Sequence, residues 1–88
     1  MLQVSERAGI LLKETLLNER QEDNQVFRLH QRDNPIALGL GVADETDILF
    51  EHDGTPILAT PAHLANELED VIIDCKDSPE GPRLVLMR

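Results

Sequence analysis

The side chains best suited to chemistry in this sequence are one thiol and a few imidazoles. Cys75 is the single cysteine. The histidines are His30, His52 and His63. None of them pairs with the cysteine, with another histidine or with a carboxylate at a recognised zinc-site spacing. Cys75 alternates with Val71 and Ile73, so we expect it to share their face of a strand as a small buried hydrophobic residue.

Oxygen donors gather near one of these histidines. His52 lies between Glu51 and Asp53, and further carboxylates precede them: Asp44, Glu45 and Asp47. A calcium loop would need an acidic first ligand, and Leu49 occupies that position in the pattern. We interpret the cluster as a solvated acidic rim and predict no metal site. If a metal were held weakly, its candidate ligands would be Cys75, His52 and Asp53.

The sequence offers no catalytic constellation. Catalysis needs a nucleophile beside a base, or paired carboxylates in a pocket. Ser5 and Ser78 stand in a helix cap and in a turn, which gives each a structural role. Gly39 and Gly41 form a G-x-G, but no third glycine and no helix start follows to make a phosphate loop. We therefore predict a protein that is not an enzyme and has no cofactor-binding residues.

The composition predicts one acidic domain with an aliphatic core. The chain has 88 residues, of which 41% are hydrophobic and 28% are charged, and its formal charge is −9. We expect residues 1–88 to form a single domain. Phe27 and Phe50 are the only aromatic residues in the sequence, so stacking platforms for bases are absent.

Charge and apolar pattern also exclude classes of partner. A charge of −9 repels nucleic acid and anionic membranes, so charged partners should be basic. No apolar run approaches the roughly 20 residues that span a bilayer, and no signal-peptide pattern is present. A lone cysteine excludes an internal disulfide and suits a reducing compartment. We expect a cytoplasmic protein that binds neither nucleic acid nor membrane.

Periodic patterns predict seven short strands and two helices in an α+β fold. Ser5 is the expected N-cap of the first helix, and Thr60 and Pro61 are the expected N-cap and first residue of the second. Short connections favour mixed or antiparallel sheets with the helices covering one face. The strands are expected over residues 2–4, 26–31, 36–42, 48–52, 55–59, 70–75 and 83–88, and the helices over residues 6–18 and 61–68. The order is strand, helix, four strands, helix, two strands, and turn-rich connections fall at 32–35 and 76–82.

The strongest local signal is the hairpin around Asp53-Gly54. A type I′ turn needs positive φ at both central residues, and this dipeptide is typical of it. The turn predicts a register, with the following pairs: His52 with Thr55, Glu51 with Pro56, Phe50 with Ile57, and Leu49 with Leu58.

Residues 36–42 read IALGLGV and predict a strand with two unlike faces. One face is aliphatic: Ile36, Leu38, Leu40 and Val42. The other is nearly bare: Ala37, Gly39 and Gly41. We expect the aliphatic face to pack under the helices and the bare face to let a neighbouring sheet or a partner chain approach closely.

From Asp47 to Cys75 the sequence resembles the HesB/IscA family of A-type iron–sulfur cluster carriers. The stretch DILFEHDG matches the family's hairpin strand, Phe27-Arg28-Leu29 matches its "LRL"-type strand, and residues 61–68 match its short helix. The resemblance implies the HesB-like fold over nearly the whole chain. It also implies that residues 36–42 lie inside a sheet, directly after the loop that carries a cluster ligand.

The departures from the family pattern bear on function. The family's first ligand cysteine lies on the loop that here reads Arg32-Asp33-Asn34-Pro35, without a cysteine. Its other two form a Cys-Gly-Cys pair in a C-terminal tail, and this sequence ends at Arg88 without such a pair. None of the three ligands can be carried over. The sequence is most similar to divergent family members that lack the ligand cysteines.

Two interpretations follow from the absence of the three ligand cysteines. The first is a non-catalytic HesB/IscA-like protein without a cofactor, a degenerate iron–sulfur assembly homologue that acts by binding assembly or client proteins. The alternative is a weak carrier of iron or an iron–sulfur cluster, held by Cys75, histidines or acidic residues across a dimer. A homodimer is compatible with both, because the family's carriers self-associate.

Overall fold

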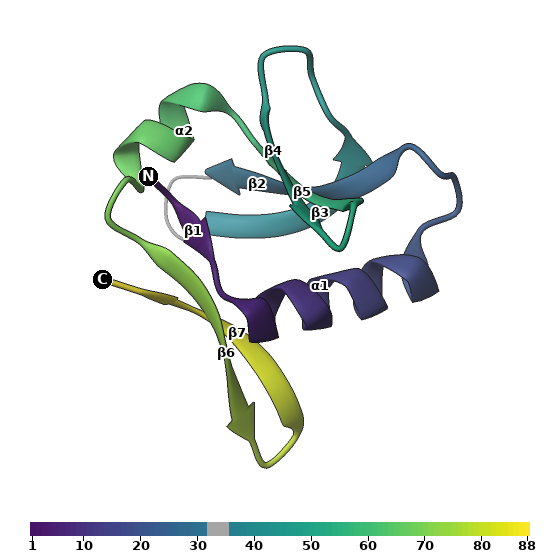
Figure 1. The fold of residues 1–88 in the computed structure, drawn as a ribbon, viewed down its shortest axis with the longest axis vertical. Helices are drawn as coiled ribbons and strands as arrows, with labels where there is room; N and C mark the ends of the chain where they lie inside the picture. Colours follow the sequence, from purple (N-terminus) through teal and green to yellow (C-terminus); the bar gives the residue numbers. More distant parts are fainter. Residues whose placement is uncertain (32–35) are drawn as a thin grey trace.

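The computed structural model describes residues 1–31 and 36–88 (Figure 1). Within them lie two helices, α1 (Glu6–Glu19) and α2 (Ala62–Glu67). The strands are β1 (Gln3–Val4), β2 (Gln25–Gln31), β3 (Ile36–Val42), β4 (Ile48–His52), β5 (Thr55–Thr60), β6 (Ile72–Ser78) and β7 (Gly81–Met87). The order of elements and the α+β class confirm the prediction. The turn predicted over residues 32–35 lies outside the described residues.

The strands form two sheets. One has the order β1-β6-β7 and the other has the order β3-β2-β5-β4. β1 runs parallel to β6, and β2 runs parallel to β5, whereas the remaining neighbours are antiparallel. The predicted mixed sheets are therefore confirmed. Both parallel pairs join segments that are distant in the sequence, which short turns cannot do.

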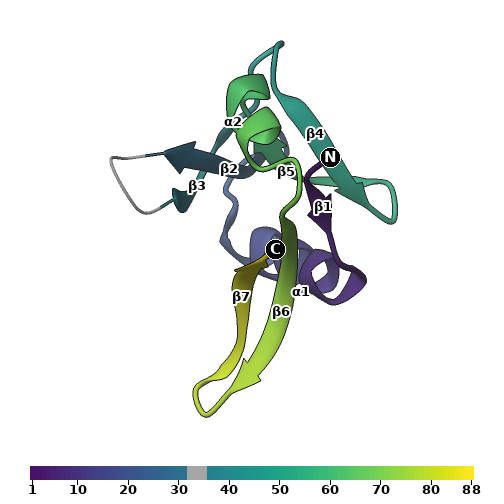
Figure 2. The same ribbon diagram turned by 90° about the vertical axis from the view of Figure 1, so that its left-hand side faces the viewer.

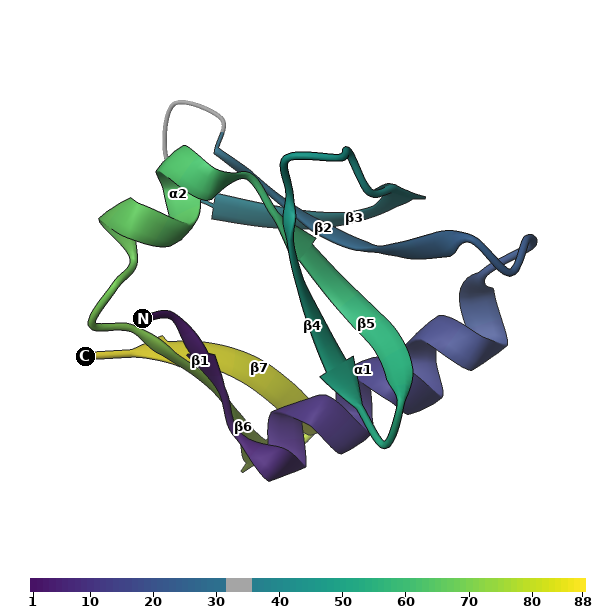
Figure 3. The same ribbon diagram turned by 45° about the horizontal axis from the view of Figure 1, so that its top comes forward.

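Helix α1 packs against both sheets rather than over one face of a single sheet. It contacts β6 of the three-stranded sheet and β2, β4 and β5 of the other (Figure 3). Its buried side chains Ala8, Leu12 and Leu16 repeat at helical spacing and belong to the common core. The predicted N-cap is confirmed, because the Oγ of Ser5 accepts from the backbone N of Ala8 at 3.2 Å. No helix of the described residues is long and apolar enough to cross a membrane.

The hairpin of β4 and β5 turns as predicted but pairs differently further from the turn. Asp53 and Gly54 have φ values of 50° and 80°, as a type I′ turn requires. After the predicted pair of Glu51 with Pro56, a bulge shifts the register, so that Phe50 faces Leu58. The predicted pairs of Phe50 and Leu49 are therefore wrong by one residue. The bulge turns consecutive β5 side chains towards the core, and β5 is buried from Ile57 to its end.

The second hairpin is longer than the sequence predicts. The segment 76–82 was expected as a connection, but β6 and β7 continue through most of it, and the turn is reduced to Pro79 and Glu80. Its polar residues pair across the strands, with Lys76 opposite Arg83. The positive φ of 115° at Gly81 closes the turn. The alternation of Val71, Ile73 and Cys75 as buried residues is confirmed.

Helix α2 begins one residue later than predicted. Pro61 is its N-cap and makes no side-chain hydrogen bond, while Thr60 ends β5. Thr60 is fully buried, and its Oγ1 has no hydrogen-bond partner among the described residues. The backbone N of Ala65 donates to the carbonyl of Pro61 at 2.9 Å and closes the first turn. Leu64, Ala65 and the C-cap residue Leu68 are buried and form the inner face of this helix.

β3 is an edge strand, in contrast to the position inside a sheet that the family resemblance implies. Only β2 pairs with it in the described structure. The exposed fractions of Leu38, Leu40 and Val42 are 38%, 39% and 56%, so the helices do not cover the aliphatic face as expected. The reason is geometric, because α1 lies against β4 and β5 on the far side of β2.

Candidate functional site

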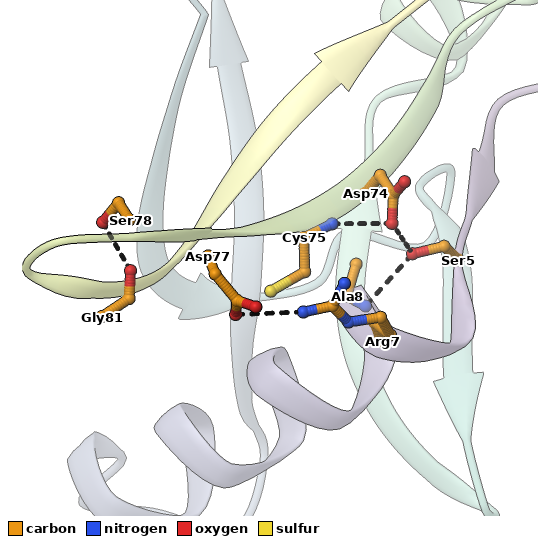
Figure 4. Close-up of polar contacts among 8 residues, drawn as sticks. All are labelled: Ser5, Arg7, Ala8, Asp74, Cys75, Asp77, Ser78 and Gly81. Carbon is orange, nitrogen blue, oxygen red and sulfur yellow. Dashed lines mark hydrogen bonds and ion pairs between the residues drawn. The ribbon is translucent and has the colours of Figure 1, made fainter.

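Cys75 is held in a polar network that fastens helix α1 to strand β6. The Oγ of Ser5 donates to Oδ1 of Asp74 at 2.7 Å, and the backbone N of Cys75 donates to the same oxygen at 2.7 Å (Figure 4). The Ser5 hydrogen bond, the Cys75 N–H and the nearby cations of Arg7 and Lys76 together hold the pKa of Asp74 below its ordinary value. These contacts give Ser5 and Asp74 a structural role.

The thiol of Cys75 is 4% exposed and points towards α1 (Figure 4). A hollow of about 290 Å³ lies beside it. An ion pair between Nη2 of Arg7 and Oδ1 of Asp77, 3.1 Å apart, involves two of the residues that line this hollow. The other lining residues are Ile10, Leu11, Glu14 and Pro82. The surroundings of Cys75 match the buried, small hydrophobic residue that the strand pattern predicts.

His52 and Asp53 lie in a different place from Cys75. They border a second hollow, whose other lining residues are Ile10, Lys13, Glu14 and Leu17. Because Ile10 and Glu14 of α1 line both hollows, the helix stands between the thiol and the imidazole. In the described parts of the chain, no three His, Cys, Asp or Glu residues gather where they could hold a metal ion. That Cys75, His52 and Asp53 bind no metal stays a prediction.

The imidazole of His52 has a packing role. Its Nδ1 lies 2.7 Å from the position that a Cβ on Gly9 would occupy, so the glycine in α1 makes room for the ring. Its Nε2 lies 3.5 Å from Oδ2 of Asp53. The other histidines lie apart, with His63 in the first turn of α2 and His30 on β2.

The acidic rim is only partly solvated, which corrects the interpretation from the sequence. The side chain of Asp47 is 2% exposed and forms an ion pair with Arg28, at 2.9 Å to Nε and 2.8 Å to Nη2. Asp47 also accepts from the backbone N of Asp44 at 3.0 Å. Asp44 is itself exposed and lies 3.8 Å from Nη2 of Arg28. The buried pair exists because Arg28 points to the outer face of its sheet and crosses to the loop after β3.

The bare face of β3 is occupied by side chains of its own neighbour strand. The Cδ of Arg28 lies 3.4 Å from the position of a Cβ on Gly41, and Nε2 of His30 lies 3.5 Å from that of Gly39. The expected close approach therefore comes from β2 and not from another sheet. The register pairs Arg28 with Gly39 and His30 with Ala37, so long side chains of β2 stand opposite the smallest residues of β3. This alternation of large and small residues is the feature of the sequence that could have indicated the contact.

The aliphatic face of β3 borders an open groove that the sequence analysis missed. β3 and β7 lie on the same side of the molecule (Figure 2). Two hollows of about 170 Å³ and 290 Å³ lie between them, and Leu38 and Leu84 line both. The floor comes from core residues: Leu12, Phe27, Leu29 and Ile73. The feature of the sequence that could have indicated this groove is a seven-residue strand, β3, with neither a charge nor a proline.

Comparisons with known proteins identify the fold. No protein-family model and no curated protein matches the sequence. The structure is similar to the crystal structure of Escherichia coli SufA, involved in the biosynthesis of iron–sulfur clusters, with a TM-score of 0.78 and 20% identity over 99% of this chain and 84% of SufA. It is also similar to the crystal structure of IscA with a 2Fe-2S cluster, with a TM-score of 0.65 and 19% identity over 100% of this chain and 85% of IscA. The chain thus has the HesB/IscA-like fold that its sequence resemblance implies.

The donor set of this chain does not match a cluster held by cysteines. Such clusters usually take four protein ligands, mostly thiolates. The 88 residues contain one thiol, and it is buried. The residues that stand where the resemblance places a ligand cysteine, at 32–35, lie outside the described structure and include no cysteine.

Proposed function

We propose that this protein is a non-catalytic, HesB/IscA-like protein that acts in iron–sulfur assembly by binding other proteins and holds no cluster of its own. One observation carries the proposal. The chain overlays on SufA along 99% of its length, yet its single thiol is enclosed against α1. A retained scaffold with too few thiolates is suited to protein contacts. We further propose that residues 1–88 act as one domain in the cytosol.

Anaerobic reconstitution tests the absence of a cluster. The protein is incubated with ferrous iron and sulfide under reducing conditions, desalted, and assayed for visible absorbance and bound iron. We expect the wild type and Cys75→Ser to retain equally little iron, because one thiolate cannot replace four ligands. Circular dichroism and a Cys75→Ala variant check that the substitutions leave the fold intact.

A stable coloured species that disappears in Cys75→Ser would contradict the proposal. That result would favour the alternative, a weak iron or iron–sulfur carrier that uses Cys75, His52 and acidic residues across a dimer. Sedimentation of the reconstituted sample then shows whether two chains share the metal.

Capture of partners tests the other half of the proposal. The tagged protein is used to capture proteins from its native cytosol, and each candidate is then titrated as a purified protein. We expect the confirmed partners to be iron–sulfur assembly proteins or proteins that carry such clusters. If no purified candidate binds, or if all the confirmed partners lie outside this chemistry, the proposal is wrong.

A further inference from the structure

The outer edge of β3 differs from the other sheet edges in the described structure. β1 is two residues long, β4 carries Glu51 and pairs irregularly with β5, and β7 carries Pro82 and Arg83. Short length, bulges, charges and prolines are the features by which proteins keep an edge from pairing with another chain. β3 pairs with β2 over seven residues without a register shift and contains neither a charge nor a proline. It is therefore the edge most open to an additional strand.

Exposed aliphatic side chains extend this edge into a binding surface. Leu40 and Val42 are 39% and 56% exposed, and Leu38 leads into the groove shared with Leu84 of β7. The smaller hollow, at about 170 Å³, is below the usual small-molecule pocket of about 300–1,000 Å³, and the larger, at about 290 Å³, is at its lower limit. Alternate side chains of an extended peptide lie about 6.6 Å apart and can enter neighbouring hollows.

Carboxylates surround one end of this surface. Val42, the last residue of β3, pairs with Gln25, the first residue of β2. Exposed acidic residues stand just before Gln25 and just after Val42: Glu22, Asp23, Asp44 and Glu45. Arg28 is compensated by its ion pair with Asp47, which leaves Arg20 as the cation set against these four carboxylates. The Val42 end of β3 is therefore negative.

This charge distribution favours a basic partner over a second copy of the chain. Two copies would each carry a net formal charge of −9, so they repel one another at long range. Opposite charges at the rim of an interface raise the association rate, and like charges disfavour wrong partners. An aliphatic strand with lysine or arginine at one end complements both the edge and its acidic flank.

We propose that β3 receives an extended segment of a basic protein partner. The segment adds a strand beside β3, inserts aliphatic side chains between β3 and β7, and places basic residues against the carboxylates at the Val42 end. Main-chain hydrogen bonds supply affinity in this binding mode, and the hollows for alternate side chains supply specificity. The inference rests on the proposed function, protein binding, and names the surface and the partner's chemistry.

Peptide titrations test whether β3 binds an extended basic segment. The probes are nine-residue peptides of alternating valine and threonine, with two lysines at the N-terminus, two lysines at the C-terminus, or two glutamates in their place. Binding to the whole protein is followed by backbone amide shifts in nuclear magnetic resonance. We expect at least one lysine peptide to bind about 10-fold more tightly than its glutamate counterpart at low salt, with the gap narrowing as salt is added. The shifts should centre on β3 and β7.

Matched variants separate the effect of apolar contact at β3 from the effect of the acidic residues beside it. Leu40→Asn with Val42→Asn should weaken binding about 10-fold by removing apolar contact. Leu49→Asn with Ile72→Asn, two aliphatic residues of 50% and 41% exposure elsewhere, should leave binding unchanged. Neutralising the flank by Glu22→Gln, Asp23→Asn and Glu45→Gln should weaken binding about 3-fold or more. Its control makes the same change in charge on other surfaces: Glu67→Gln, Glu69→Gln and Glu80→Gln.

Four outcomes would overturn the inference. The lysine and glutamate peptides could bind equally, the shifts could fall outside β3 and β7, or a variant set and its control set could weaken binding alike. The fourth is a dimer of this chain, seen by sedimentation, that Leu40→Asn with Val42→Asn dissociates, which would assign the surface to a second copy instead. In each case partner capture by the wild type can still succeed, so failure of this inference is distinguishable from failure of the proposed function.

Discussion

The ion pair between Arg28 and Asp47 gives the most exacting test of how β2 packs across β3. Asp47→Ala removes the acceptor of a charge-assisted hydrogen bond from Nε of Arg28, the ion-pair partner of its Nη2, and the acceptor of a hydrogen bond from the backbone N of Asp44. Removing one partner of a buried pair costs about 3–5 kcal/mol. The guanidinium is 20% exposed and can regain some water, which places the loss of unfolding free energy near the lower end, at about 3 kcal/mol.

Two comparisons isolate the pair. Asp44→Ala removes a carboxylate that is 77% exposed and 3.8 Å from Arg28, so it should cost less than about 1 kcal/mol. The double variant Arg28→Met with Asp47→Leu replaces both charges with apolar groups and should recover most of the loss. A double-mutant cycle on these sites should give a coupling energy of about 2 kcal/mol.

Urea unfolding followed by circular dichroism at 222 nm measures these differences by linear extrapolation. Asp47→Ala should not cost as little as Asp44→Ala, and a coupling energy below about 0.5 kcal/mol would refute a strong pair between Arg28 and Asp47. Either result would mean that the pair is open to water in solution and that Arg28 does not stay over the bare face of β3.

Three further predictions concern other close contacts, and each can be checked by the same unfolding assay. Gly9→Ala should lower the unfolding free energy by about 1 kcal/mol because its Cβ meets the ring of His52, yet in a His52→Ala background it should raise it by a similar amount through helix propensity. Thr60→Val should raise the unfolding free energy by about 1 kcal/mol, since it removes a buried hydroxyl that lacks a partner in the described structure. The pKa of Asp74 is lowered from 3.8, chiefly by the Ser5 hydrogen bond. The contribution of Asp74 to stability is therefore present above the pKa of the unfolded state and is lost as pH falls through the pKa of the folded state. Ser5→Ala should therefore reduce the loss of stability between about pH 5 and pH 2, and an unchanged pH dependence would contradict this.

Local chemistry accounts for what the sequence predicted well. The turn at Asp53-Gly54, the N-cap at Ser5 and the buried alternation at Cys75 each depend on residues within a few positions of one another, and all three are confirmed. Periods of 3.6 and 2 also gave every element in the right order. The bulge beside Pro56 was missed because the turn type predicts a regular register along the hairpin, whereas the structure inserts Ile57 as an extra residue of β5.

The features of the candidate site that the sequence did not predict depend on contacts between distant segments. That β3 is an edge follows from the parallel pairing of β2 with β5, which leaves β3 outside the sheet's centre. The burial of Asp47 needs Arg28, 19 positions earlier, to cross the bare face of β3. Both residues were visible in the sequence, but only the register of β2 with β3 brings them together.

The pairing of β1 with β6 imposes an order on folding. Gln3 stands beside Ile72, and the Ser5–Asp74 hydrogen bond joins residues 69 positions apart. Closing so long a loop is entropically costly and slows the formation of non-local sheets. During synthesis the N-terminal strand must therefore wait, unpaired, until β6 has left the ribosome. The β4–β5 hairpin and α1, whose hydrogen bonds are local, can form well before the three-stranded sheet locks the ends of the chain together.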